Sequence, residues 1–255
     1  MVGRLAGKRV LITGAGGLMG ADVARAFAAE GADLVLTTRS AAKLEPLADE
    51  LRGRGVRIAT VAADFTRDAD IDRLAEEAWA AFDGLDIVLL SSQPPEPNQG
   101  ELLDLPMATL LEQQQVIAWG PFRLLRKLVP NMIAAKISAS IITVTSSTGF
   151  EQPVPGYGAY GIAKGTLWIM TRQMAMEWGK YGIRCNAFQP GHVATGDDAQ
   201  AAAFTAALHA NGWMPRTALG RVGRNAECMG ALIYLASDES SFTSGQRLIV
   251  NGGRF

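Results

Sequence analysis

The feature that most constrains the fold of this chain is a regular alternation of short apolar runs with longer helical patterns. Stretches rich in Ala and Leu, such as Ala21–Glu30 and Ile162–Lys180, lie between the apolar runs. This alternation indicates βαβ units and a parallel sheet whose strands are buried on both faces. Strands are expected at Arg9–Thr13, Asp33–Thr38, Val56–Ala62, Asp86–Leu90, Ser140–Thr145, Arg184–Gln189 and Leu248–Val250. The sequence therefore predicts one α/β domain over residues 1–255, a doubly wound, seven-stranded parallel sheet with helices on both faces.

Composition argues against several other classes of protein. Of the 255 residues, 48% are hydrophobic and 19% are charged, which is compatible with a sizeable core. The formal net charge of −1 provides no basic surface for nucleic acid or an anionic membrane, and no apolar run is long enough to span a bilayer. Cys185 and Cys228 form no CxxC motif, so we expect two reduced core thiols and no metal site. The absence of a signal-peptide pattern predicts a cytoplasmic protein.

A glycine-rich turn, TGAGGLMG, lies between the first expected strand and the first expected helix. Glycines let the backbone approach an anion, and the amides and dipole of the helix N-terminus attract it. This strand, turn and helix predict a pyrophosphate site in a dinucleotide-binding Rossmann fold, although a simple tight turn is the alternative. The candidate cofactor-binding residues of the turn are Gly14, Gly16, Gly17, Leu18, Met19 and Gly20.

The ends of the next three strands provide candidates for the adenosine side of the cofactor. The second strand ends in Thr38, Arg39 and Ser40, without the acidic residue that would accept a bond from a ribose 2′-hydroxyl. A guanidinium suits a 2′-phosphate, so NADP(H) is favoured over NAD(H), unless Arg39 is only a solvated loop cation. Asp64 is a candidate for binding the adenine amino group, or else a helix N-cap. Phe65, Ser91 and Ser92 complete this set of candidates.

Tyr160 and Lys164 are spaced i, i+4 in YGIAK and would therefore lie on one face of a helix. A phenol has a pKa of about 10, and an adjacent ammonium would stabilise its phenolate and lower that pKa. Tyr160 could then exchange a proton with a substrate oxygen. The same spacing also occurs by chance on helix surfaces, so the pair needs further support.

Five segments in order resemble the short-chain dehydrogenase/reductase family, from Lys8 to Gly253: TGAGGLMG, ITVTSST, YGIAK, IRCNAFQPGHVAT and the C-terminal LGRVGRNAECMGALIYLASDESSFTSGQRLIVNGG. The resemblance implies that Tyr160 is the general acid/base and that Lys164 binds the nicotinamide ribose and lowers the tyrosine pKa. It also implies a serine that orients the substrate oxygen. Strand register favours Ser146, while counting back from Tyr160 favours Ser147. The residues implied to border the nicotinamide are Pro190, Gly191, Val193 and Thr195, with His192 as a wall residue.

Three positions depart from the family pattern. Leu18 replaces the middle glycine of the turn, which puts cofactor affinity in doubt. The segment Leu90-Ser91-Ser92-Gln93 replaces Asn-Asn-Ala-Gly, so the adenosine-side wall must be built differently. Ile117 stands at the position of the family's relay asparagine, and its side chain can neither donate nor accept a hydrogen bond. A proton relay would then depend on the main-chain carbonyl at this position.

The resemblance leaves more than one function open. The main expectation is hydride transfer between NADP(H) and a carbonyl or secondary alcohol. Alternatives are an enoyl reductase that uses Tyr157 with Lys164, and a cofactor-binding protein with weakened catalysis. A helical, alanine-rich lid is expected over about residues 196–219, and its Phe204, Trp213 and Met214 suggest a hydrophobic substrate. By resemblance, the protein should be a homo-oligomer, a tetramer or dimer, that uses the helix around Gly120–Ile133 and the final helix and strand.

Overall fold

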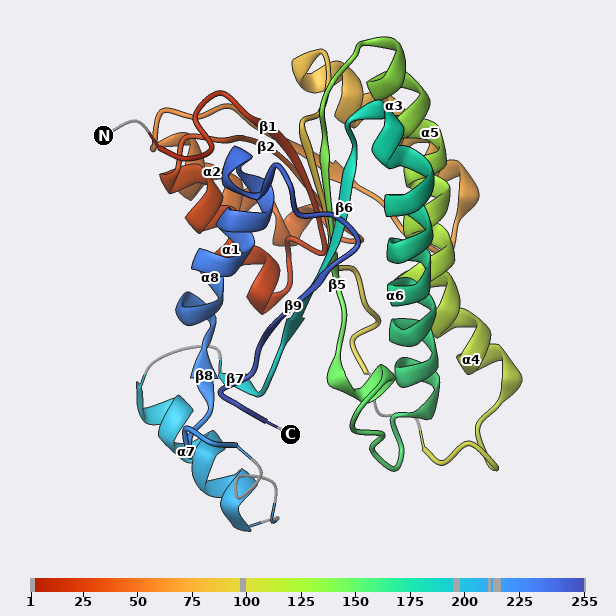
Figure 1. Cartoon of the computed structure of the whole chain (residues 1–255), viewed down its shortest axis with the longest axis vertical. Helices are drawn as coiled ribbons and strands as arrows, with labels where there is room; N and C mark the ends of the chain where they lie inside the picture. The colour runs from red at the N-terminus through yellow and green to blue at the C-terminus, as the bar shows by residue number, and fades with distance from the viewer. Residues whose placement is uncertain (1–2, 97–99, 195–197, 211, 213–216, 255) are drawn as a thin grey trace.

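A seven-stranded sheet runs through the centre of the molecule in the computed structural model, which describes residues 3–96, 100–194, 198–210, 212 and 217–254 (Figure 1). The spatial order of the strands is β3-β2-β1-β4-β5-β6-β9, and all neighbours pair in parallel. The strands are β1 (Arg9–Thr13), β2 (Asp33–Thr38), β3 (Ile58–Ala62), β4 (Ile87–Leu90), β5 (Ser140–Val144), β6 (Arg184–Pro190) and β9 (Arg247–Val250). The predicted doubly wound sheet is confirmed, with boundaries that differ from expectation by one or two residues.

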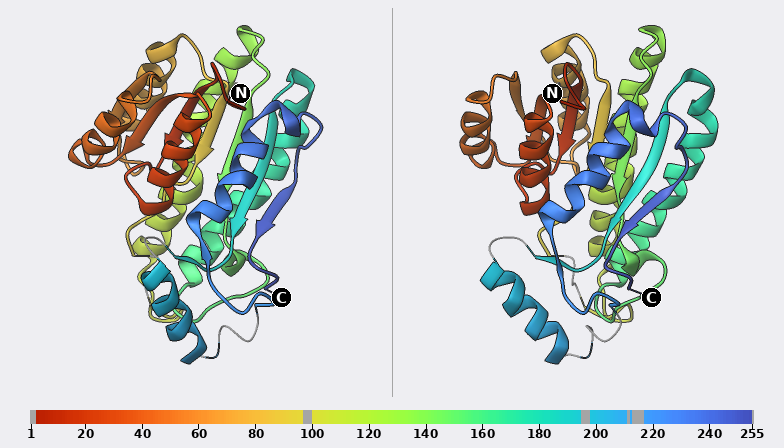
Figure 2. Two further views of the ribbon diagram at one scale, coloured as in Figure 1. Left: turned by 90° about the vertical axis from the view of Figure 1, so that its left-hand side faces the viewer. Right: turned by 60° about the vertical axis from the view of Figure 1, so that its left-hand side comes forward.

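Helices cover both faces of the sheet, as Figures 1 and 2 show. One face carries α1 (Leu18–Ala29), α2 (Glu45–Arg52) and α8 (Asn225–Ala236). The other face carries α3 (Asp68–Phe82), α5 (Gly120–Ala134) and α6 (Gly158–Trp178). The helix α4 (Met107–Gln114) leads into α5 through a π-helical turn at Gln115–Trp119 and packs against α6.

The side chains of β1 show why its apolar run forms a central strand. Val10 and Ile12 are fully buried in the core that α1 and α8 cover. Leu11 is equally buried, but it belongs to the core under α3 and α5. Because successive strand residues point to opposite faces, only a continuous apolar run can fill both layers.

A second, two-stranded parallel sheet was not expected from the sequence. It consists of β7 (Val193–Ala194) and β8 (Gly223–Arg224), and a pairing of two residues leaves no periodic signal. The helix α7 (Asp198–Ala210) lies apart from the two helix layers (Figure 2), and it confirms the helix expected in the lid segment. Trp213 and Met214 lie outside the described residues.

Several smaller expectations can also be compared with the structure. Gly31 has a φ of +87° after α1, and Gly182 has a φ of +77° before β6, as expected for glycines that end helices. Cys185 and Cys228 are free and buried. No helix in the described part of the chain is both long and apolar enough to cross a membrane.

Candidate active site

The carboxyl edge of the sheet carries a cleft at the point where the strand order reverses, between β1 and β4. Ligands of doubly wound sheets bind at such switch points. The cleft has a volume of about 390 Å³. It brings together twelve residues expected from the sequence: Gly14, Gly16, Gly17, Met19, Gly20, Thr38, Arg39, Ser91, Ser146, Tyr160, Pro190 and Gly191. Sequence reasoning named Gln93 only as part of the altered adenosine-side wall, and it missed five further lining residues: Lys43, Pro94, Pro95, Val144 and Thr145.

The glycine turn has no room for side chains. A Cβ on Gly20 would lie 2.2 Å from the Gly14 carbonyl oxygen, and one on Gly14 would lie 2.7 Å from the Ser91 carbonyl oxygen. Gly14 also has a φ of +71°, which favours glycine. The helix α1 begins at Leu18 without a side-chain cap or an acidic residue in its first turn. Its N-terminal amides are therefore available to an anion, which fits the pyrophosphate of a dinucleotide.

The segment after β4 shows how the unusual Leu-Ser-Ser-Gln sequence builds the neighbouring wall. Thr13 Oγ1 accepts hydrogen bonds from the Ser91 backbone N–H at 3.0 Å and from Ser92 Oγ at 2.8 Å. Ser92 is buried, and its hydroxyl is used for this bond to Thr13. The wall is thus tied to the end of β1 by one threonine hydroxyl.

A second hollow adjoins the cleft at the ends of β2 and β3. Its lining residues are Gly14, Thr38, Arg39, Ala63, Asp64, Phe65, Ser92, Gln93, Pro94, Glu112 and Val116. Asp64 also has a structural role, because its Oδ1 accepts bonds from the Thr66 backbone N–H and hydroxyl. It is not the N-cap of α3, which is Arg67. Ser40 and Val193 line neither the hollow nor the cleft, and Thr195 lies outside the described residues.

Two cations stand at the junction of these hollows. The side chains of Arg39 and Lys43 are exposed, and Arg39 borders both the cleft and the adjoining hollow. Neither side chain has an ion pair or hydrogen bond within the described ranges, whereas arginines such as Arg25 and Arg57 are paired with carboxylates. This end of the cleft therefore presents two cations without an ion pair within the described residues, and the carboxylates of Asp64 and Glu112 line the adjoining hollow.

Ser146, Tyr160 and Lys164 come together at the other end of the cleft. Ser146 follows β5, and its side chain lies close enough to Tyr160, in the first turn of α6, to have a lowering effect on the pKa of the phenol. One turn later, Lys164 Nζ donates a 2.6 Å hydrogen bond to the Val144 carbonyl. The ammonium lies 5.5 Å from the centroid of the Tyr160 ring. Lys164 is only 1% exposed and does not line the open cleft.

The two candidate serines differ in their surroundings. Ser146 lines the cleft beside Tyr160 and accepts a bond from the Thr148 backbone N–H at 3.3 Å. Ser147 begins a short 3-10 turn, Ser147–Gly149, and does not line the cleft. The geometry therefore supports Ser146 as the partner of Tyr160.

Burial controls the protonation of this group. It raises the pKa of Tyr160 to about 12, against a lowering effect of Ser146 and with a smaller raising effect of Tyr157. Burial also lowers the pKa of Lys164 to about 7. The expected depression of the tyrosine pKa by the ammonium is thus wrong for this structure, because desolvation of the phenolate dominates. At neutral pH, Tyr160 carries its proton.

His192 lies beside Gly191, and its Nδ1 is 3.3 Å from the Arg254 guanidinium. Burial, with a further contribution from Arg254, lowers the pKa of His192 to about 4. Its ring centroid lies 6.1 Å from that of Phe204 on α7. The neutral ring lies between the loop that follows β6 and the helix α7. No cluster of three or more His, Cys, Asp or Glu side chains suited to a metal occurs in the part of the chain that the structure describes.

Ile117 lies in the apolar core next to Tyr160. It is 1% exposed and lies in an apolar cluster with Ala118, Ala163 and Leu167, against which Tyr160 packs. The residue belongs to the π-helical turn between α4 and α5. Such turns often mark functional sites, because they offset the backbone hydrogen bonds of the helix.

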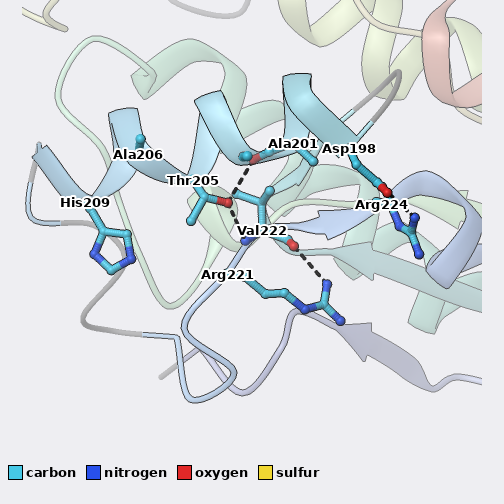
Figure 3. A pocket seen from close by; sticks show the side chains of 9 residues that line it. Asp198, Ala201, Thr205, Ala206, His209, Arg221, Val222 and Arg224 are labelled. Carbon is cyan, nitrogen blue, oxygen red and sulfur yellow. Dashed lines mark hydrogen bonds and ion pairs between the residues drawn. The ribbon is translucent and has the colours of Figure 1, made fainter.

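The hollow beneath α7 is larger than the cleft, with a volume of about 670 Å³, but it contains none of the catalytic candidates (Figure 3). Thr205 Oγ1 donates to the Ala201 carbonyl and accepts from the Val222 N–H. Asp198 pairs with Arg224 at 2.7 Å. These contacts attach the lid helix to the β7–β8 sheet rather than to the cleft.

Comparisons with known proteins agree with this geometry. A family model described as "Enoyl-(Acyl carrier protein) reductase" matches residues 14–254. An A-factor type γ-butyrolactone 1′-reductase (1S-forming) from Streptomyces virginiae is 34% identical, and the match covers 98% of this chain and 96% of that protein. The structure of a short-chain type dehydrogenase/reductase from Mycobacterium marinum is 28% identical, with a TM-score of 0.85, and the match covers 98% of this chain and 95% of that one. The chain belongs to the short-chain dehydrogenase/reductase family.

A further solved structure agrees with this assignment. A 7α-hydroxysteroid dehydrogenase complexed with NADH and 7-oxo glycochenodeoxycholic acid is 27% identical, with a TM-score of 0.88, over 98% of this chain and 95% of that one. The resemblance inferred from the five sequence segments is confirmed. This short-chain dehydrogenase/reductase is therefore an NAD(P)(H)-dependent oxidoreductase.

Proposed function

We propose that this short-chain dehydrogenase/reductase interconverts a carbonyl and a secondary alcohol, with Tyr160 as general acid/base and Ser146 as the donor that orients the substrate oxygen. The observation that carries the proposal is that Ser146 and Tyr160 line the same cleft, beside Pro190 and Gly191, and lie close enough for Ser146 to have a lowering effect on the pKa of the phenol. Two hydroxyls that converge beside the expected nicotinamide position can hold one substrate oxygen between them. The reductase and hydroxysteroid dehydrogenase names of the relatives support the same reaction class.

The residues have distinct parts in this reaction. When bound, the nicotinamide supplies a hydride to the carbonyl carbon, or accepts one in the reverse direction. As the substrate oxygen gains negative charge, Tyr160 donates its phenolic proton, and Ser146 donates a hydrogen bond to the same oxygen. The Lys164 ammonium, 5.5 Å from the phenol ring, would stabilise the phenolate that remains. The order is reversed for alcohol oxidation, in which Tyr160 must first lose its proton.

NADP(H) is the proposed cofactor. Arg39 and Lys43 provide two cations beside Thr38, and the end of β2 has no carboxylate. A 2′-phosphate would gain charge-assisted hydrogen bonds from both. The 7α-hydroxysteroid dehydrogenase is complexed with NADH, so family membership does not choose between the cofactors. The preference for NADP(H) depends on the two cations.

A hydrophobic substrate is proposed from the lid. Phe204 on α7 lies against His192, which is in the segment expected to border the nicotinamide. The experiment that tests the reaction is NADPH oxidation with a panel of cyclic and aryl ketones, in parallel with NADH and with no ketone. Ketone-dependent turnover that is faster with NADPH is expected. A protein that binds NADPH but reduces no ketone would contradict the proposal and favour a cofactor-binding protein with weakened catalysis.

Reduction of a carbon–carbon double bond is the second candidate. It is favoured by the description of the matching family model and by Tyr157, whose ring meets the Tyr160 ring edge to face at 6.3 Å. Tyr157 immediately precedes α6, and its side chain is partly exposed. Enones offered beside the ketones separate the two reactions, because analysis of the product shows which bond was reduced.

A homo-oligomer, either a tetramer or a dimer, is proposed for the same enzyme. Large apolar side chains are exposed on α4 and α6: Met107, Leu111, Ile162, Ile169 and Met176. The large apolar side chains of α5, such as Leu124 and Leu128, are buried instead. Ile249 is 41% exposed on β9, whose outer edge is unpaired in the described sheet. Light scattering at micromolar concentration tests this, and a stable monomer would contradict it.

A further inference from the structure

The 3-10 turn Ser147–Gly149 lies directly against the backbone of α6. A Cβ built on Gly149 would lie 2.8 Å from the Gly165 nitrogen and 2.9 Å from the Gly161 carbonyl oxygen. A Cβ on Gly161 would lie 2.8 Å from the Thr148 carbonyl oxygen. Real Cβ atoms do not approach other heavy atoms this closely, and backbone atoms of a packed helix cannot turn aside as a flexible side chain can. The turn and the helix therefore touch only because side chains are absent between them.

The requirement at Gly149 is one of space rather than of backbone conformation. Gly149 does not have a positive φ, unlike Gly14 or Gly156. An alanine could adopt its backbone angles without strain. A methyl group at this position would nevertheless occupy the space of α6, so the turn or the helix would have to move.

Side-chain contacts on the outer side of the same turn also hold it against α6. Phe150 packs edge to face against Trp168 of α6, with ring centroids 6.4 Å apart. The Arg247 guanidinium from β9 lies 4.6 Å from the Phe150 ring centroid and 5.6 Å from that of Trp168. Arg247 also pairs with Glu151. Since aromatic and cation–π contacts of this kind are attractive, they hold the turn against the helix.

The turn Ser147–Gly149 links Ser146 to the part of α6 that carries Tyr160 and Lys164. Ser146 is the residue immediately before the turn, and its Oγ accepts the Thr148 backbone N–H. Tyr160 and Lys164 immediately precede Gly161 and Gly165 on α6. The backbone contact between turn and helix therefore sets the separation between the Ser146 and Tyr160 hydroxyls.

We propose that Gly149 is a positioning residue: its missing side chain lets the serine turn rest on α6, which brings Ser146 next to Tyr160. The expected change in kcat rests on the proposed carbonyl chemistry. The expected displacement of Ser146 does not. The turn is also held from its other side by the contacts among Arg247, Phe150 and Trp168. Because the turn cannot move away freely, a methyl group at Gly149 increases the separation between the Ser146 and Tyr160 hydroxyls.

The test is Gly149→Ala, with Gly230→Ala as the matched control. Gly230 also lies in the described structure, in the interior of α8, but its Cβ would meet nothing within 4 Å. We expect Gly149→Ala to lower kcat by roughly tenfold to a hundredfold, the range expected when a reacting group is misplaced by about 1 Å. The Kd of NADPH should stay unchanged, because Gly149 does not line the cleft. Gly230→Ala should keep the wild-type kcat.

Two further readouts separate misplacement from general damage. Ser146 has a lowering effect on the pKa of Tyr160. The loss of this effect should therefore move the pH profile of alcohol oxidation to higher pH in Gly149→Ala but not in Gly230→Ala. If Gly149→Ala does not fold, Gly165→Ala is the milder variant, because its Cβ would lie 3.3 Å from the Gly149 carbonyl oxygen. The same changes are then expected at smaller size.

A crystal structure of the variant provides a test that does not need activity. The Ser146 hydroxyl should be displaced from the Tyr160 hydroxyl relative to the wild-type protein. An undisplaced serine, or a folded Gly149→Ala variant with wild-type kcat and pH profile, would overturn the inference. A wild-type protein that reduces no ketone would instead overturn the proposed reaction, and the displacement would still decide the role of Gly149.

Discussion

The two ends of the cleft hold their positive charges in opposite ways. At the adenosine end, Arg39 and Lys43 are exposed and make no polar side-chain contact within the described ranges. At the catalytic end, Lys164 is 1% exposed, and the Val144 carbonyl accepts its hydrogen bond. An exposed cation is hydrated and screened, so replacing it changes ligand affinity with little effect on the fold. A buried cation is coupled to both stability and chemistry, because its desolvation is a large free-energy cost.

The largest effect is expected from the residue that transfers the proton. Tyr160→Phe removes the acid while keeping the packing against Ile117, so NADPH should still bind and turnover should fall on the order of a hundredfold or more. Tyr157→Phe is the control, because Tyr157 belongs to the same aromatic pair. Steady-state rates with a ketone compare the two variants. A greater loss in Tyr157→Phe would favour the enoyl reductase.

Replacement of the buried lysine should separate catalysis from stability. Lys164→Met should lower turnover strongly, yet it should not lower the melting temperature at pH 6.5, because the folded protein no longer has to bury an ammonium. The pKa of Lys164 is lowered from 10.5 to about 7, so the unfolded chain binds more protons between these two pH values. The stability of the wild type relative to Lys164→Met should therefore rise as the pH increases across this interval.

Thermal melts of both proteins at pH 6.5 and pH 9.5 measure this difference. The melting temperature of the wild type relative to that of Lys164→Met should be higher at pH 9.5, where the buried lysine is neutral, than at pH 6.5. If the difference in melting temperature between wild type and Lys164→Met is the same at both pH values, Lys164 is not desolvated as the structure indicates.

A smaller effect is expected at the adenosine end. Thr38→Asp combined with Arg39→Ala should reverse the preference toward NADH, because a carboxylate repels a 2′-phosphate and accepts a bond from a ribose hydroxyl. Lys43→Met should weaken NADPH binding roughly tenfold, about the value of one charge-assisted hydrogen bond, with little change for NADH. Fluorescence titration of both cofactors measures these constants.

The control for this charge removal is Lys136→Met. Lys136 is exposed and lies between α5 and β5, at the opposite edge of the sheet from the cleft. Its replacement should change neither cofactor constant. Tighter binding of NADH than of NADPH by the wild type would contradict the proposed role of Arg39 and Lys43.

The smallest effect on rate is expected at Ile117. Ile117→Asn would place an amide in an apolar cluster and should destabilise the fold by about 1–3 kcal/mol. If proton supply limits turnover, the variant should nevertheless show a modest increase in rate near neutral pH. An identical rate and pH profile in the two proteins would show that proton supply does not depend on this side chain.

Local sequence patterns predicted the phosphate turn and the Tyr160–Lys164 helix because each depends on a short segment. The i, i+4 spacing places both side chains on one face of any α-helix. Lys43 was missed because it follows the expected β2 motif by several residues and enters the cleft only through the 3-10 turn at Ala41–Lys43. The local sequence could not decide between Ser146 and Ser147, because a shift of one residue in the turn changes which hydroxyl lies next to Tyr160.

The sequence alone determined the parallel sheet and the position of the nucleotide turn, since apolar periodicity and glycine placement act over a few neighbouring residues. Only the tertiary structure decided the protonation of the catalytic group. Tyr160 and Lys164 depart from their ordinary pKa values in opposite directions, to about 12 and about 7, because packing buries Lys164 fully and Tyr160 in part. Desolvation depends on atoms from β5, the π-helical turn Gln115–Trp119 and α6 together, and no local pattern in the sequence records how closely they meet.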